Sequence, residues 1–164
     1  MLIDNVIGFA RFSVDDIDPN LCTHMIYYHA DIDAETYEII IEDHNADIDN
    51  KGYEKFVGLK IKNNLLKTMI SIGLDWEDAT VQRKYLNLVK NAANINKFAQ
   101  SAVAFLYKHK LDGINLHWLP SYTKNIGFTN LAVKLHNVFK QHKFLLSAIG
   151  SPYENEIDTG KFCG

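Results

Sequence analysis

Short apolar runs alternate with longer amphipathic stretches along this chain. The strand-like runs begin near residues 23, 66, 111 and 144. Between them, apolar residues recur every three or four positions, which is the spacing of one buried helix face. This alternation predicts successive βαβ units and therefore a parallel α/β sheet.

Three stretches carry the predicted helices. The first covers residues 53–64 and is expected to stop at Asn63 and Asn64. The pattern from Val81 to Lys110 is long enough for a polar helix and a second, apolar one, with Asn94 or Asn96 as the N-cap of the second. The third helix covers residues 128–141. The residues expected to be buried on the last two helices are Phe98, Ala102, Phe105, Leu106, Leu131, Leu135, Val138 and Phe139.

The loop at residues 43–52 alternates Asn and Asp side chains, as calcium loops do. It lacks the glycine at the sixth position and the closing glutamate that the EF-hand spacing requires. We therefore expect a solvated turn here. The seven histidines form no HxH or HxxxH pair, so we also expect no metal site and no cofactor.

Composition narrows the class of protein. The 164 residues are 47% hydrophobic and 23% charged, which is typical of one packed globular domain over residues 1–164. A net charge of −3 argues against a nucleic-acid partner. No window approaches the ~20 apolar residues of a membrane span, so we expect no membrane partner.

Residues 112–120 read Asp-Gly-Ile-Asn-Leu-His-Trp-Leu-Pro. This segment closely resembles the signature strand of the family 18 glycoside hydrolases, the chitinases. The family pattern is Asp-Gly, apolar, Asp, apolar, Asp, Trp, Glu, and the final Glu is the proton donor. On that pattern Asp112 keeps the first carboxylate, Asn115 and His117 replace the next two, and Leu119 replaces the acid. If a deletion follows Trp118 instead, Leu119 matches the family's next residue and the Glu is absent.

Other segments resemble the same family in the same order. Residues 12–24 contain its Ile-Asp-Pro and Leu-Cys-Thr-His sequences, residues 66–73 resemble its third strand, and residues 144–149 resemble its fifth. The resemblance spans residues 12–150 and implies a partial (β/α)8 TIM-barrel, roughly strands 2 to 5 with their helices. A complete barrel needs ~250 residues, so we expect a truncated domain of about half a barrel.

The resemblance implies a site that has lost its chemistry. Cleavage of a glycosidic bond needs a protonated carboxyl group beside the leaving oxygen, and in this family the substrate's N-acetyl group is the nucleophile. Leucine at position 119 can donate no proton. His117 could in principle donate one, because its ordinary pKa is near ~6.5, but it occupies the place of an orienting Asp. A structural histidine bonded to a neighbouring strand is the competing interpretation.

The carboxyl ends of the predicted strands provide candidate contacts to chitin or a chito-oligosaccharide. These candidates are His29, Trp76, Asn115, His117 and Trp118. Each has a structural alternative: Trp118 shares the Ile114–Leu116 face that should meet the helices, and Asn115 could simply bond to its neighbours. The first hypothesis is thus an inactive chitinase-like protein that binds chito-oligosaccharides. The alternative is a non-binding, partner-dependent scaffold that self-associates through open sheet edges.

The family is mostly secreted, so the resemblance implies an extracellular protein. No basic and apolar leader is visible at the amino terminus. Two cysteines, Cys22 and Cys163, are too few for a disulfide framework, and we expect mostly free thiols.

Overall fold

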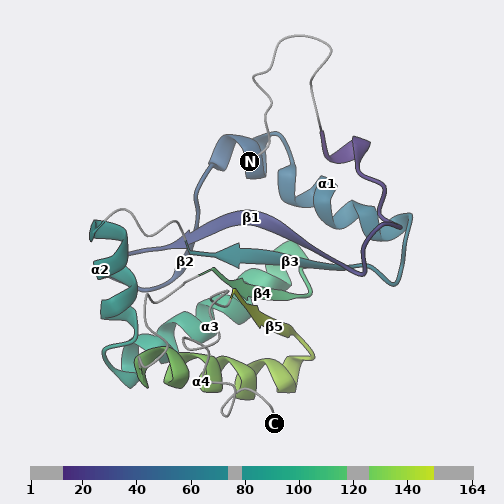
Figure 1. The fold of residues 1–164 in the computed structure, drawn as a ribbon. Coiled ribbons are helices and arrows are strands. Elements are labelled where there is room, and N and C mark those ends of the chain that lie inside the picture. Colours follow the sequence, from purple (N-terminus) through teal and green to yellow (C-terminus); the bar gives the residue numbers. More distant parts are fainter. Residues whose placement is uncertain (1–12, 74–78, 118–125, 150–164) are drawn as a thin grey trace.

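The computed structural model describes residues 13–73, 79–117 and 126–149, which form a five-stranded sheet (Figure 1). The strand order is β2-β1-β3-β4-β5. Strands β1 (His24–Ile32), β3 (Lys67–Ile72), β4 (Gly113–Leu116) and β5 (Leu145–Ala148) are parallel to their neighbours among these four. The predicted parallel α/β class and the four predicted strand positions are therefore confirmed.

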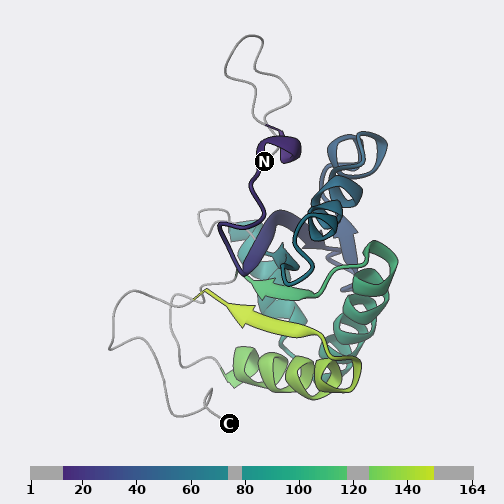
Figure 2. The same ribbon diagram turned by 90° about the vertical axis from the view of Figure 1, so that its right-hand side faces the viewer.

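Helices connect the parallel strands and follow one another around one side of the sheet (Figure 2). They are α1 (Gly52–Gly58), α2 (Ala79–Leu88), α3 (Ala92–His109) and α4 (Ile126–His142). Short helical turns occupy η1 (Val14–Asp16), η2 (Asn45–Asp49) and η3 (Leu59–Ile61). The long pattern that begins at Val81 divides into α2 and α3, as predicted.

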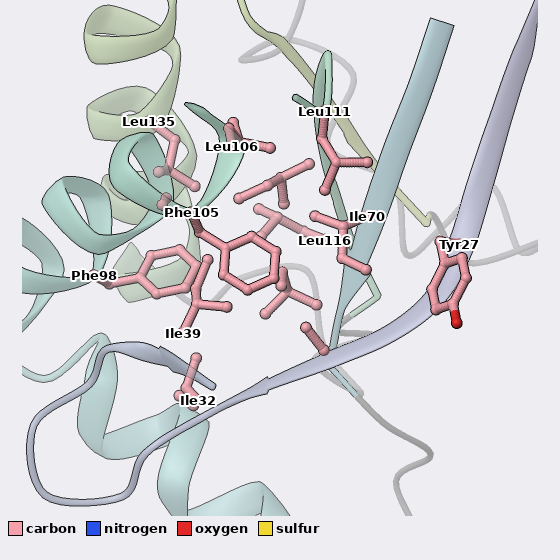
Figure 3. Close-up of a cluster of buried hydrophobic side chains, with 14 of the residues drawn as sticks. Tyr27, Ile32, Ile39, Ile70, Phe98, Phe105, Leu106, Leu111, Leu116 and Leu135 are labelled. Carbon is pink, nitrogen blue, oxygen red and sulfur yellow. The ribbon is translucent and has the colours of Figure 1, made fainter. Parts of the chain in front are cut away.

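The core lies between the sheet and these helices (Figure 3). Ile70 of β3 and Ile114 of β4 are completely buried there, against helix residues that include Phe98 and Leu135. Side chains alternate between the two faces of a strand. Burying Ile70 and Ile114 therefore turns the residues between the core positions, among them Ser71 and Asn115, to the opposite face.

Strand β2 (Ile39–Ile41) was not predicted from the sequence. It pairs antiparallel with the last residues of β1 through a tight turn. In that turn the Asp33 carboxylate accepts hydrogen bonds from the backbone N–H groups of Glu35 and Thr36, at 2.9 and 2.7 Å. The Ser101 hydroxyl of α3 accepts a bond from Ile39 N at 2.8 Å and holds the short strand in place.

Two expectations about polar segments were wrong. The N-cap of α3 is Asn91, whose side chain accepts a hydrogen bond from Asn94 N at 2.9 Å, and neither Asn94 nor Asn96 is the cap. The loop at 43–52 is not simply a solvated turn. It contains the turn η2, and its Asp47 is only 4% exposed because its carboxylate accepts a 2.6 Å bond from the Tyr27 hydroxyl.

Asp112, the carboxylate that the chain shares with the chitinase pattern, lies at the amino end of β4. Its Oδ2 accepts bonds from Lys60 Nζ at 2.9 Å, Thr68 N at 2.8 Å and Thr68 Oγ1 at 3.1 Å. Burial acts to raise the pKa of Asp112, but the bonds from Lys60 and Thr68 outweigh it and lower that pKa. Five residue steps along the strand, roughly 16 Å, separate Asp112 from His117. Asp112 therefore anchors β4 to β3 at the end of the sheet opposite His117.

Gly113 is required by the close approach of β4 to β5. A Cβ atom at this position would lie 2.2 Å from the Leu145 carbonyl oxygen and 2.7 Å from its Cβ. We predict that Gly113→Ala lowers the free energy of unfolding by about 2–3 kcal/mol through overpacking. The matched control is Gly58→Ala, since a Cβ there meets nothing within 4 Å. Urea denaturation midpoints measure both, and equal midpoints would contradict the assignment.

We predict that Asp112→Asn lowers the free energy of unfolding at pH 7 by about 2 kcal/mol, because it weakens bonds to a charged acceptor. The pKa of Asp112 is lower in the folded state than the unfolded value of ~3.9. Its contribution is therefore present above pH ~4 and is lost as the pH falls through the folded-state pKa. Urea denaturation should show the difference in the free energy of unfolding between wild type and Asp112→Asn shrinking as the pH is lowered. The control Glu35→Gln, at an exposed position, should differ little from wild type at any pH.

Candidate functional site

A row of hydrogen-bonded polar side chains crosses the sheet on the face opposite the core. Ser71, Asn115 and Ser147 are register partners on β3, β4 and β5. The Ser147 hydroxyl donates to Asn115 Oδ1 at 2.8 Å, and Asn115 Nδ2 donates to Ser71 Oγ at 3.4 Å. Asn115 is 4% exposed. Its amide is therefore fixed by the neighbouring strands, as the structural alternative for this residue required.

His117 follows directly after β4, at the carboxyl end of the sheet. Its backbone N–H donates to the Ile72 carbonyl at 2.9 Å and continues the pairing of β4 with β3. Its half-buried imidazole lies with its centroid 5.4 Å from the ring of Tyr28 on β1. The backbone thus ties His117 to β3, while the ring packs across the sheet toward β1.

His29 is a second imidazole in contact with the same tyrosine. The centroids of the His29 and Tyr28 rings are 4.4 Å apart. His29 Nε2 is buried and finds no hydrogen-bond partner among the described residues. Burial lowers the pKa of His29, although the nearby Glu42 and Asp31 carboxylates oppose that shift. The imidazole is therefore neutral at pH 7.

We call Tyr28, His29 and His117 the aromatic cluster. Two of its members were predicted from the sequence, but Tyr28 was missed because a single tyrosine within an apolar strand reads as a core residue. Tyr28 is 38% exposed. The cluster presents flat rings and imidazole nitrogens at the edge where parallel α/β proteins bind their ligands.

Asp31 of β1 belongs to a buried polar network that sequence reasoning also missed. The residue is 6% exposed. Its carboxylate accepts bonds from Tyr85 Oη at 2.7 Å and from Ile32 N at 2.8 Å, and it forms an ion pair with Lys84. Burial and the Asp31 charge raise the pKa of Tyr85, so its phenol remains a donor. The hydrophobic periodicity of the sequence predicts the strand that holds Asp31 and the helix that holds Lys84 and Tyr85. It does not predict that residues 53 and 54 positions apart will pair.

Three of the predicted site residues, Trp76, Trp118 and Leu119, lie outside the described residues. Within the described ranges, no group of three or more His, Cys, Asp or Glu side chains could hold a metal ion. The described helices also include none that is long and apolar enough to cross a membrane. Cys22 is an exposed free thiol, and Cys163 lies outside the described residues.

The sequence and the fold of the chain are similar to those of known chitinases and chitinase-like proteins. The chain is 36% identical over 161 residues to probable chitinase 10 of Drosophila melanogaster, which covers 92% of the chain and 7% of that protein. Human YKL-39, described as a pseudo-chitinase with retained chitooligosaccharide binding properties, shares 30% identity with a TM-score of 0.76, over 90% of this chain and 41% of that one.

A second solved structure is an insect chitinase domain with bound sugar. It is catalytic domain 2 of the Ostrinia furnacalis group II chitinase, a glutamate-to-leucine mutant in complex with penta-N-acetylchitooctaose, at 35% identity and a TM-score of 0.79. The match covers 90% of this chain and 40% of that one, so the chain spans less than half the length of these relatives. The model for glycosyl hydrolases family 18 matches residues 5–162. The chain therefore belongs to glycosyl hydrolases family 18, and its open sheet has the fold of part of the family's α/β barrel.

Proposed function

We propose that this protein is a catalytically inactive, chitinase-like protein that binds chito-oligosaccharides at the carboxyl end of its sheet. The observation that carries the proposal is the chemistry of β4 at that end. An amide at position 115 and an imidazole at position 117 stand where the family pattern has carboxylates, and the Asn115 amide already bonds to Ser71 and Ser147.

The carboxylates that the described residues place at the end of β1 cannot replace the missing acid. Asp31 is engaged by Lys84 and Tyr85. Asp33 accepts bonds from the turn backbone, and those bonds lower its pKa. A general acid for glycoside cleavage needs a raised pKa. The lowered pKa of Asp33 opposes proton donation, and Asp31 is occupied by its ion pair with Lys84 and its bond from Tyr85.

Retained sugar binding is supported by the aromatic cluster. The flat faces of Tyr28 and His117 suit the apolar face of a pyranose, and imidazole nitrogens can exchange hydrogen bonds with sugar hydroxyls. The related human YKL-39 is a pseudo-chitinase that keeps this binding. The related insect domain was crystallised with a chito-oligosaccharide although a leucine replaces a glutamate. Loss of an acid and loss of binding are therefore separable in relatives of this chain.

The competing function is a scaffold without a sugar ligand. The observation that favours it is that the sheet of the described residues has two edge strands, β2 and β5. Residues Leu145–Ser147 of β5 are only half-buried, so this edge is open to a further strand. Strand edges can pair with a second copy or with another chain. We propose the binding function first because the aromatic cluster lies at the end of the sheet where parallel α/β proteins bind ligands. Open edge strands alone do not require a partner. An extracellular location is proposed with it, on the family resemblance.

We predict that N-acetylated chitotetraose raises the thermal midpoint of the full chain, since a ligand stabilises the state it binds. We also predict no hydrolysis of a fluorogenic chito-oligosaccharide above background. His117→Ala should weaken binding about five- to tenfold, the scale of one lost aromatic contact. His136→Ala, at an exposed histidine of α4, is the matched control and should bind as wild type does.

Each half of the proposal can fail separately. Hydrolysis that disappears in His117→Ala would overturn the inactive assignment and make this histidine the proton donor. A cooperative melt that no chito-oligosaccharide shifts would overturn the binding assignment. Concentration-dependent assembly in sedimentation, in that case, would identify the scaffold function.

A further inference from the structure

The amino end of the sheet exposes large apolar side chains to an unusual degree. Of the described large hydrophobic residues, the three most exposed are Leu21 at 79%, Ile61 at 90% and Leu65 at 79%. Leu21 and Leu65 lie in the loops that lead into β1 and β3, and Ile61 ends the turn η3 that precedes the second of these loops. These loops touch, since Asn63 Nδ2 donates to the Pro19 carbonyl at 2.9 Å and Lys67 N donates to the Thr23 carbonyl at 3.0 Å.

Lysines surround these apolar residues. Lys62 and Lys67 flank Ile61 and Leu65 in the sequence and are exposed. The adjoining loops add exposed Lys110 and Lys143, and the β3 and β4 loops are joined where Lys60 Nζ bonds to the Lys110 carbonyl at 2.9 Å. The loops into β1, β3, β4 and β5 share the right-hand end of the sheet in Figure 1. Asp15, Asp16 and Asp18 are the exposed acids of the segment that precedes Leu21.

Helix electrostatics explains only part of this arrangement. Lys110 and Lys143 follow the ends of α3 and α4, where a cation interacts favourably with the helix dipole. Lys62 caps the shorter helical run of α1 and η3, so the dipole can account for it as well. Lys67 begins β3 and has no such explanation, and the dipole gives no reason to expose Ile61 and Leu65. A single exposed apolar residue is ordinary, but three on two segments that are hydrogen-bonded to each other are more than chance exposure requires.

We propose that this lysine–aliphatic surface docks on an anionic lipid bilayer. Aliphatic side chains that project from loops can enter the interface, while the surrounding lysines meet lipid phosphates and carboxylates. The chain as a whole carries a net charge of −3. The rest of the molecule is therefore acidic enough to be repelled by the same bilayer, and the contact is oriented.

The charge of the surface also argues against a second copy as its occupant. Two such surfaces brought face to face would place their lysines against one another, which is unfavourable. The composition led us to expect no membrane partner because the sequence lacks a spanning segment. Docking at the interface needs no spanning segment. The inference does not rest on the proposed function, whose aromatic cluster lies at the opposite end of the sheet.

The test is co-sedimentation of the full chain with vesicles of phosphatidylcholine alone and of phosphatidylcholine with phosphatidylserine. We predict binding to the anionic vesicles and little to the neutral ones. Binding should weaken as salt rises from about 0.05 M to about 0.5 M, because ions screen exposed charges. The double variant Ile61→Gln/Leu65→Gln should reduce partitioning about tenfold or more, and Lys62→Gln/Lys67→Gln should reduce it to a similar degree.

The matched control is Ile126→Gln/Val133→Gln, which removes exposed apolar residues from α4, 65% and 51% exposed, away from the patch. It should bind vesicles as wild type does, and circular dichroism should show all variants folded. Equal binding by the control and the Ile61/Leu65 variant would overturn the proposal, as would failure to bind anionic vesicles. Capture by an immobilised acidic peptide without vesicle binding would also overturn it, in favour of an acidic protein partner.

Discussion

Burial of one face of the parallel sheet against the helices is the constraint on which the rest of the structure depends. Ile70 and Ile114 have no exposed surface, and Phe98 and Leu135 close over them from α3 and α4. Because strand side chains alternate, this burial fixes the opposite face as the place for Ser71, Asn115 and Ser147. A shift of one residue in register would turn the core residues to the opposite face and the polar row toward the helices.

The same register separates the two ends of the sheet. At the amino end, the Asp112 carboxylate forms an ion pair with Lys60 and accepts a hydrogen bond from Thr68 N. These charged contacts fix the start of β4 against β3. At the carboxyl end, the rings of Tyr28 and His117 meet across the sheet with the neutral His29 beside them. A motif that is continuous in sequence is thus divided in space: its first carboxylate stabilises the fold, and His117 lies at the carboxyl end of the sheet. This division explains how a chain can keep Asp112 and the family fold while position 117 changes character.

Sequence patterns predicted the parts of the fold that depend on periodicity. The four parallel strands and the division into α2 and α3 follow from period two and period 3.6, which Ile70 and Phe98 obey. Pairings between distant residues were not predictable in this way. The ion pair of Asp31 with Lys84, the burial of Asp47 under Tyr27 and the strand β2 each depend on which elements meet in space. The N-cap was assigned wrongly because positions 91, 94 and 96 are all asparagine, which is equally suited to cap a helix at each of them. Only the backbone geometry selects Asn91.

The amide at position 115, where the family pattern has a carboxylate, suits the burial of the polar row. A carboxylate at position 115 would be 4% exposed if the site kept its present shape, and its described side-chain neighbours would be the hydroxyls of Ser71 and Ser147. A buried charge without a cation carries a large desolvation cost, whereas an amide can donate to one hydroxyl and accept from the other. Asp31 shows the opposite solution, because there the carboxylate is retained and Lys84 balances it. Catalytic carboxylates are held against this cost by selection for activity. In a chain without that selection, as the proposed function requires, an amide is the neutral side chain of matching shape that satisfies both serines.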